Sequence, residues 1–217
     1  MRADSPVTTV GILGAGKVGT VLARLSIAAG YRTLISASAD PSAIELIVDV
    51  LAPGATAMTS ADVAADAELV ILALPLGKYR TLPVAELAGK VVVDSTNYWT
   101  PTDGVIDQFE NDLDSSSILA AFLPRSRVVK AFNHLGYHQL DEDGRPTGAP
   151  DRHAMAIAGD HAEALQVVSD FVDSLGFDAV VAGPLASGIH FGPGSALFGV
   201  SAPRAEVEHL LSLARTT

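Results

Sequence analysis

The chain has 217 residues, a formal net charge of −11 at pH 7 and no cysteine. The acidic balance argues against nucleic acid or an anionic membrane surface as the main partner, because either requires a basic footprint. The lack of cysteine excludes disulfides, thiolate nucleophiles and cysteine-ligated metal clusters. We expect a cytoplasmic protein without a membrane anchor, since no segment reads as a signal peptide or is long enough to cross a bilayer.

The first predicted element is a strand over the apolar residues 7–10, followed by the segment GILGAGKVG at residues 11–19. Gly14, Gly16 and Gly19 have the G-x-G-x-x-G spacing where a strand should end and a helix begin. The first glycine permits a tight turn, the second lets a pyrophosphate approach the backbone, and the third lets helix and strand pack closely. Free N–H groups at the helix start favour an anion. The predicted pyrophosphate site therefore consists of Gly14, Ala15, Gly16, Lys17, Val18 and Gly19.

The helix that follows has apolar residues at helical spacing over 18–29, ends at Gly30, and leads to a strand at 33–35. An NAD site usually has an acidic residue near the end of that second strand. Here Ser36 and Ser38 occupy the region, and Asp40 precedes Pro41 as the N-cap of a further helix. Small hydroxyls without a carboxylate leave no anion to repel a 2′-phosphate, although the arginine expected for that phosphate is also absent. We therefore expect NADP(H) to be preferred over NAD(H).

Continuous apolar strands are predicted at residues 69–74, 91–93 and 128–129, with helices at 60–66 and 115–123. Such strands are typical of a parallel sheet covered on both faces, so the predicted fold is α/β, a Rossmann doubly wound, mostly parallel sheet. A polar segment rich in Gly and Pro, residues 141–152, divides a dinucleotide-binding domain (1–145) from a small C-terminal α/β extension (146–217).

The extension should contain strands at 154–158 and 177–181 and a helix between them. Asp160 with Glu163 predicts a capping box at the start of that helix, and Gly176 its end. A terminal helix is expected over residues 203–214.

In an open parallel sheet, ligands bind outside the carboxyl ends of the strands. A nicotinamide would lie across the ends of the last three strands of the N-terminal domain. Pro75 and Leu76 would press on the ring face, beside Leu74. Asn97 or Asn133 would hold the carboxamide, although each is equally suited to stabilising a tight turn. His134 and Leu135 follow Asn133 on the same rim, and His134 is a candidate donor to substrate or cofactor.

Reduction of a carbonyl needs a proton donor as well as a hydride. None of the four tyrosines has a lysine four residues later, and the long helical domain of lysine-dependent hydroxy-acid dehydrogenases has no counterpart here. Transfer between two ring cofactors depends mainly on stacking and orientation, and the sequence fits it better. His134 and His138 lie four residues apart, but no third ligand is evident, so we expect no metal site.

Four motifs occur in the order typical of one known family: residues 11–19, VVVDSTNYW at 91–99, VVKAFNHLG at 128–136 and AGPLASG at 182–188. The chain resembles NADPH-dependent reductases of the deazaflavin coenzyme F-420. Its KAFN run is also similar to the cytoplasmic oxidoreductase domains of membrane ferric reductases. The resemblance implies a Rossmann domain with an extension that completes a second-cofactor pocket, and hydride transfer between nicotinamide C4 and deazaflavin C5.

By that resemblance, residues 14–18 hold the pyrophosphate and residues 36–38 the 2′-phosphate. Pro75, Leu76 and residues 133–135 contact the nicotinamide, which makes Asn133 and His134 the candidate catalytic residues, and residues 188–193 line the deazaflavin side. The chain lacks the arginines that the family usually has near Ser38 and near His190. Two alternatives stay open: a reductase of a small carbonyl or imine substrate, and a non-catalytic NADP(H)-binding redox sensor. A flavin is a further candidate acceptor, and a homodimer is expected.

Overall fold

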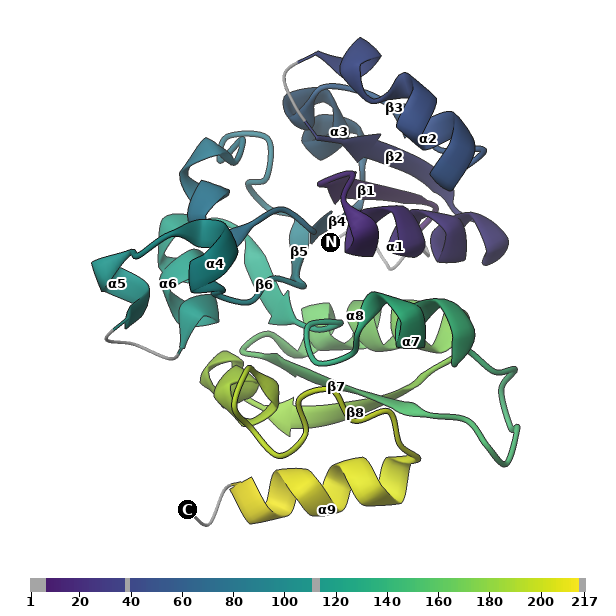
Figure 1. Ribbon diagram of the computed structural model, residues 1–217, viewed down its shortest axis with the longest axis vertical. Coiled ribbons are helices and arrows are strands. Elements are labelled where there is room, and N and C mark those ends of the chain that lie inside the picture. The colour runs from purple at the N-terminus through teal and green to yellow at the C-terminus, as the bar shows by residue number, and fades with distance from the viewer. Residues whose placement is uncertain (1–6, 38–39, 111–113, 215–217) are drawn as a thin grey trace.

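The computed structural model describes residues 7–37, 40–110 and 114–214. Its central feature is an eight-stranded sheet with the strand order β3-β2-β1-β4-β5-β6-β7-β8 (Figure 1). The strands are β1 (Thr9–Leu13), β2 (Arg32–Ser36), β3 (Thr56–Ala57), β4 (Leu69–Leu72), β5 (Val91–Asp94), β6 (Arg127–Lys130), β7 (Ala154–Gly159) and β8 (Asp178–Gly183).

Helices connect these strands and cover both faces of the sheet. The α-helices are α1 (Lys17–Ala28), α2 (Glu45–Leu51), α3 (Ser60–Asp66), α4 (Thr100–Asp103), α5 (Asp107–Glu110), α6 (Ser115–Phe122), α7 (Tyr137–Glu142), α8 (Ala162–Ser174) and α9 (Arg204–Ala214). Three 3-10 segments complete the set: η1 (Pro41–Ala43), η2 (Leu76–Thr81) and η3 (Leu185–Phe191).

Strands β1 to β6 pair in parallel, which confirms the predicted Rossmann class. Strands β1, β2, β4, β5 and β6 are buried along nearly their whole length, because helices pack on both faces, whereas the short edge strand β3 is not. Leu22 of α1 and Phe171 of α8 belong to the core on one face, and Val63 of α3 and Leu119 of α6 to the core on the other. The sheet edge at the carboxyl ends of β1, β4, β5 and β6 is thereby fixed in position.

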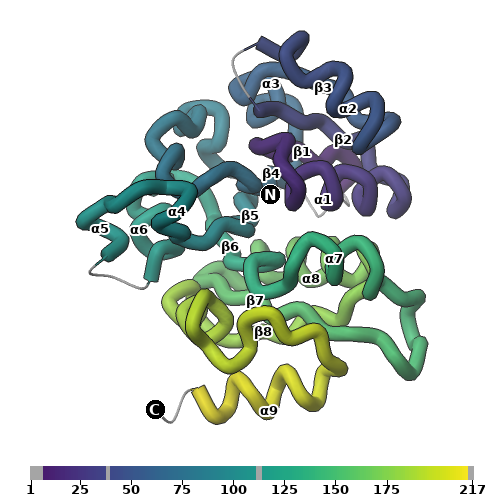
Figure 2. The backbone as a smooth tube through the Cα atoms, in the orientation of Figure 1, coloured from purple at the N-terminus to yellow at the C-terminus, as the bar shows by residue number. Residues whose placement is uncertain are grey.

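The predicted extension continues the same sheet rather than forming a separate layer. Strand β7 pairs with β6 in the antiparallel sense, and β8 pairs with β7 in parallel. Helix α9 lies beside this pair (Figure 2), and its Val207 belongs to the same hydrophobic core cluster as Ala156 of β7 and Val180 of β8. The division into residues 1–145 and 146–217 stays a prediction, but the reversal of strand direction falls within the predicted seam.

Two expected helix ends are confirmed, and one expected helix start is wrong. Gly30 and Gly176 follow α1 and α8 with φ of +91° and +98°, the left-handed conformation that favours glycine. The predicted capping box of α8 does not form, because the N-cap is His161 and has no side-chain cap. Asp160 instead accepts a hydrogen bond from the Leu185 N–H of η3 at 2.9 Å. The Asp160 carboxylate therefore binds the backbone N–H of η3 instead of an N–H group at the start of α8.

Within the described residues, no helix combines the length and apolar character that crossing a membrane would require.

Candidate functional site

The turn after β1 has the geometry that its three glycines predict. Gly14 has a φ of +132°, and a Cβ there would lie 2.2 Å from the Ala73 carbonyl oxygen. A Cβ on Gly19 would lie 1.8 Å from the Gly14 carbonyl oxygen, so helix α1 packs directly on the turn. Gly16 differs, because no described residue lies within 4 Å of a Cβ built there. Two glycines thus close the turn, and the middle one leaves open space beside the backbone.

The N–H groups of residues 15–18 belong to this turn and to the start of α1. Among the described residues, none of them donates to another backbone group, whereas the Gly14 N–H donates to the Ser36 carbonyl at 2.6 Å. Helix α1 begins at Lys17, and its first turn contains no acidic residue. Unpaired N–H groups and the positive end of a twelve-residue helix together favour an anion. This arrangement can bind a pyrophosphate.

Lys17 is directed at helix α7 as well as at solvent. Its Nζ lies 3.3 Å from the Tyr137 hydroxyl and 4.9 Å from the centre of the Tyr137 ring. Val18 is half-buried and packs against the core. Lys17 and Val18 thus contact other parts of the protein, so the main-chain N–H groups are the candidate anion ligands of the turn.

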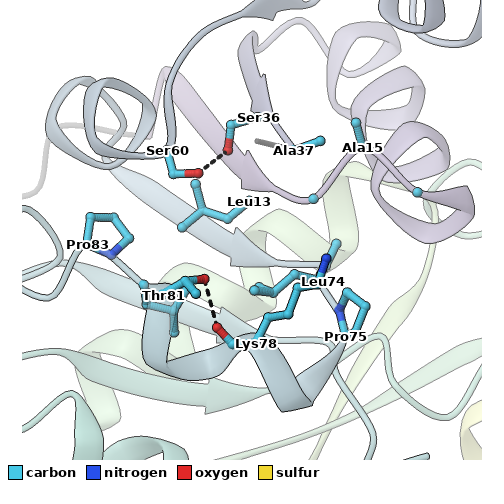
Figure 3. A pocket seen from close by; sticks show the side chains of 14 residues that line it. Leu13, Ala15, Ser36, Ala37, Ser60, Leu74, Pro75, Lys78, Thr81 and Pro83 are labelled. Atoms are coloured by element: carbon cyan, nitrogen blue, oxygen red, sulfur yellow. Dashed lines mark hydrogen bonds between the residues drawn. The ribbon is translucent and has the colours of Figure 1, made fainter. Parts of the chain in front are cut away.

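A pocket of about 270 Å³ opens beside the turn. Figure 3 shows that its walls come from the glycine turn, the end of β2, the start of α3 and the segment after β4. The lining residues are Leu13, Gly14, Ala15, Gly16, Ser36, Ala37, Ser60, Ala73, Leu74, Pro75, Lys78, Thr81, Leu82 and Pro83. The pocket thus joins the expected pyrophosphate site to the expected adenosine site.

Ser36, expected at the 2′-phosphate, lines this pocket but is fully buried. Its hydroxyl lies 3.0 Å from that of Ser60. Ser38 lies outside the described residues. Asp40 caps η1 by accepting from the Ser42 N–H at 3.0 Å, as predicted, so its carboxylate is committed to the backbone.

In the segment after β4, some side chains line the pocket and others pack in the core. Leu74 and Pro75 line the pocket. Leu76 is 1% exposed and packs in the core with Val70 and Leu72. Segment η2 begins at Leu76, whose side chain faces the core, so its contact with a nicotinamide ring stays a prediction.

Asn97 and Asn133 bind each other across the ends of β5 and β6. The Asn97 amide donates to the Asn133 carbonyl at 2.8 Å, and the Asn133 amide donates to Asn97 Oδ1 at 3.1 Å. The Asn133 amide also donates to the Phe191 carbonyl of η3 at 3.1 Å. These contacts match the turn-stabilising alternative. Asn133 Oδ1, however, is buried and has no hydrogen-bond partner among the described residues.

His134 lies beneath the rim rather than on it, with 1% of its surface exposed. Its Nε2 accepts from the Ala156 N–H of β7 at 3.1 Å, so the neutral ring carries its proton on Nδ1. Burial lowers the pKa of His134 to about 4, which keeps the ring neutral. Such a side chain joins β7 to the turn after β6 and is poorly placed to donate a proton to a bound substrate. Leu135 beside it packs in the core.

A buried ion pair that sequence reasoning missed lies under the same rim. Lys130 Nζ is 3.0 Å from Asp94 Oδ2 and also donates to the Thr96 carbonyl, and both side chains are almost fully enclosed. Burial alone would raise the pKa of Asp94. The Lys130 ammonium and the hydrogen bonds from Thr96 and Ser116 outweigh that effect and hold this pKa below its usual range. The pair fixes the ends of β5 and β6 relative to each other.

Phe132, between this pair and Asn133, is the single non-glycine residue in the described chain with a positive φ, +64°. A bulky residue in the left-handed region is strained, and such strain concentrates at functional turns. The buried ring packs edge-on against Phe171 and is held in place by it. The turn that presents Asn133 is therefore enforced by the core.

Known proteins are similar to this chain in sequence and in fold. Residues 9–98 match the family model described as NADP oxidoreductase coenzyme F420-dependent. Metalloreductase STEAP3 of Rattus norvegicus is 28% identical over 180 residues, which cover 82% of this chain. The chain spans about a third (34%) of the length of that relative.

Solved structures resemble the chain over most of its length. A hypothetical protein from Sinorhizobium meliloti is 29% identical with a TM-score of 0.76, covering 91% of this chain and 96% of its own. A provisionally named F-420-dependent NADP-reductase from Arthrobacter sp. FB24 is 22% identical with a TM-score of 0.72, covering 95% of this chain and 91% of its own. Residues 9–98, fewer than half of the chain, thus match the family described as NADP oxidoreductase coenzyme F420-dependent, and the solved structures share the fold of the chain.

Proposed function

We propose that the protein transfers a hydride between NADP(H) and a deazaflavin, coenzyme F-420, or a flavin-type acceptor. The observation that carries the proposal is the open turn at Gly16. Unpaired N–H groups at the start of α1 meet a pocket that leads to the ends of β2 and β4. A dinucleotide would bind with its pyrophosphate on these N–H groups and its nicotinamide toward β5 and β6. The family match and the four sequence motifs support the choice of acceptor.

The side chains at the ends of β5 and β6 suit a transfer between rings. Asn97 and Asn133 are bonded to each other, and His134 is enclosed and neutral. These three side chains connect the ends of β5, β6 and β7 by hydrogen bonds, and none of them is an exposed acid. Such a transfer would move an electron pair with its proton from nicotinamide C4 to C5 of a deazaflavin or N5 of a flavin, and one solvent proton would complete the reduction. This reaction depends on stacking and distance rather than on a protein acid.

An anaerobic absorbance assay with NADPH and purified F-420 tests the proposal. We expect the deazaflavin absorbance to bleach as one NADPH is oxidised per acceptor. FMN, supplied separately, tests the flavin alternative. Absence of turnover with both acceptors at stoichiometric enzyme would contradict the proposal, provided that titration shows the nucleotide still binds.

One observation favours the second candidate, reduction of a small carbonyl or imine. Tyr137 and Lys17 form a hydroxyl–ammonium pair at 3.3 Å, although 120 residues separate them in the sequence. Tyr137 is the tyrosine that this candidate would use as its donor. Replacing Tyr137 with Phe should lower carbonyl or imine turnover by about 100-fold or more if the hydroxyl donates the proton. The same variant should leave hydride transfer to F-420 nearly unchanged.

The extension is proposed to complete the acceptor pocket, by way of η3 and the segment after it. Phe191 accepts from the Asn133 amide, and the Gly199 N–H donates to the His134 carbonyl at 2.7 Å. These bonds tie residues 188–199 to the rim. The homodimer stays a proposal, which analytical ultracentrifugation of the full chain would test.

A further inference from the structure

We propose that a second cavity, between η2, α5 and α6, binds an organic carboxylate with an apolar body and holds the carboxylate on the Arg80 guanidinium. The cavity has a volume of about 410 Å³, within the range of small-molecule sites. The residues that line it are Tyr79, Arg80, Gln108, Ile118, Ala121 and Phe122. None of them lines the pocket beside the glycine turn, so the inference does not depend on the proposed function.

Segment η2 separates the two cavities. A 3-10 segment has three residues per turn, so Lys78 and Thr81 share one of its sides. Figure 3 shows both of these residues at the pocket beside the glycine turn. Tyr79 and Arg80, which lie between them in the sequence, line the second cavity instead. The second cavity is therefore a distinct place on the surface and not an extension of the first.

A chain of hydrogen bonds holds the guanidinium of Arg80 beside Gln108. Arg80 Nε donates to the Tyr79 hydroxyl at 2.9 Å, and that hydroxyl donates to Gln108 Oε1 at 3.1 Å. The guanidinium carbon also lies 5.4 Å from the centre of the Tyr79 ring, a cation–π contact. Tyr79 is buried, and its ring packs edge-on against Phe109 and Phe122. An exposed arginine is thus positioned by a side chain that the core holds.

The donors that remain on Arg80 and Gln108 suit a carboxylate. Among the described residues, nothing accepts from the two Nη atoms of Arg80 or from the amide nitrogen of Gln108, and no carboxylate lies within ion-pair distance of the guanidinium. Glu110 of the same short helix accepts from the Tyr98 hydroxyl at 2.6 Å and does not line the cavity. The planar fork of an arginine matches the two oxygens of a carboxylate.

Helix α6 gives the cavity an apolar wall. Ile118, Ala121 and Phe122 lie three and four residues apart, so they share one face of the helix. Ile118 and Phe122 are half-buried and pack against the core, whereas Ala121 is exposed. A small side chain at residue 121 leaves this wall open. One cationic group beside an apolar wall fits a ligand with a single carboxylate and an acyl or aryl body.

Two probes of the same shape test the site, 2-naphthoate and the neutral 2-naphthylmethanol. In a ligand-observed NMR titration of the wild-type chain, we expect a Kd for 2-naphthoate of about 1 mM or tighter. The alcohol should bind at least about fivefold more weakly, and this difference should shrink as salt is raised. Equal binding of the two probes, or a Kd for 2-naphthoate above about 10 mM, would overturn the proposal.

Three variants act on the site. Arg80→Met should weaken 2-naphthoate binding by about tenfold and leave the alcohol within about twofold. Tyr79→Phe keeps the ring but removes the hydroxyl that positions Arg80, so it should weaken 2-naphthoate alone, by about threefold. Ala121→Glu places a carboxylate on the exposed part of the wall and should abolish binding of 2-naphthoate. Unchanged 2-naphthoate binding in Arg80→Met or in Ala121→Glu would contradict the proposed site.

Lys78→Met is the matched control, because it removes the same charge from η2 on the side of the other pocket. It should bind 2-naphthoate within about twofold of the wild type. Saturating NADPH should not displace the probe, and displacement would place the probe in the nucleotide pocket and overturn the proposal. If F-420 and flavins are not reduced but 2-naphthoate still binds through Arg80, only the proposed function fails. Thermal unfolding checks that each variant folds.

Discussion

Two parts of one sheet edge solve the problem of positioning in opposite ways. After β1, the chain turns on glycine, leaves the N–H groups of residues 15–18 unpaired, and faces open space. After β5 and β6, nearly every polar side chain is bonded to another part of the protein, as in the Asp94–Lys130 and Asn97–Asn133 pairs. The first region is built to bind and the second is built to hold its shape.

The two regions place different requirements on their residues. A site made of main-chain groups needs small residues and one correct backbone path, so its glycines can be recognised locally. A rim held by side-chain pairs needs partners that lie 36 residues apart in the sequence, as Asn97 and Asn133 do. Substitutions in the first region should therefore affect ligand binding, whereas those in the second should affect stability first.

The largest effect is expected from breaking the buried ion pair. Lys130→Met leaves the Asp94 carboxylate buried without its cation, so we expect a loss of about 3–5 kcal/mol in the free energy of unfolding. Urea unfolding measures it. Adding Asp94→Asn to this variant removes the stranded charge and should recover part of the loss. A loss below about 1 kcal/mol in the single variant would show that the pair does not support the rim.

The converse experiment acts on the glycine turn. Gly16→Leu places a side chain in the space beside the unpaired N–H groups, and none of the residues that the structure describes lies within 4 Å of its Cβ. Affinity for ADP-ribose should fall by about 100-fold, the loss of about two hydrogen bonds to a charged group, while the unfolding free energy changes little. Gly19→Ala is the contrast, because its Cβ would overlap the Gly14 carbonyl, and it should destabilise the fold. Undiminished ADP-ribose binding in Gly16→Leu would refute the pyrophosphate site.

The elements governed by neighbouring residues were predictable from the sequence. The glycine turn, the parallel strands, the Asp40 cap and the helix ends at Gly30 and Gly176 all depend on residues within a few positions of each other. The structure confirms each of them. Periodicity and capping chemistry are local, so they leave a readable pattern.

The features that sequence reasoning missed depend on contacts between distant segments. Asp160 and Glu163 have capping-box spacing, but Asp160 binds the Leu185 N–H, 25 residues away. Leu76 follows Pro75 at the rim, yet the turn of η2 buries it. Ser60 and Lys78 line the pocket without any motif to mark them. The pairing of Lys130 with Asp94 likewise required the register of β5 and β6, which composition does not encode.

A smaller effect should follow the titration of His134. Its pKa is lowered to about 4 in the folded chain, against about 6.5 when unfolded, so the unfolded chain takes up the proton first as the pH falls. The stability linked to this group is complete above pH 6.5 and is lost toward pH 4. Between pH 7.5 and pH 5 we expect a decrease of about 2 kcal/mol, measured by urea unfolding at both values.

His134→Gln should remove most of that pH dependence, although it also lowers stability at neutral pH. His138→Gln is the matched control, because His138 is exposed and stacks only on Tyr137. The control should keep the wild-type dependence. A wild-type chain equally stable at pH 5 and pH 7.5 would mean that His134 is open to solvent.

The smallest effect, from Asn97→Ala, decides between the two roles left open for the rim amides. This variant removes the bonds to the Asn133 carbonyl and amide, but the Asn133 amide keeps its bond to Phe191. If the pair only stabilises the turns, stability should fall by about 1 kcal/mol, and affinity for NADP⁺ and for 2′-phospho-ADP-ribose should change equally. If Asn97 holds the carboxamide, NADP⁺ alone should bind more weakly. The mutual bonding of the two amides favours the first result, which would leave the nicotinamide to be positioned by the shape of the rim.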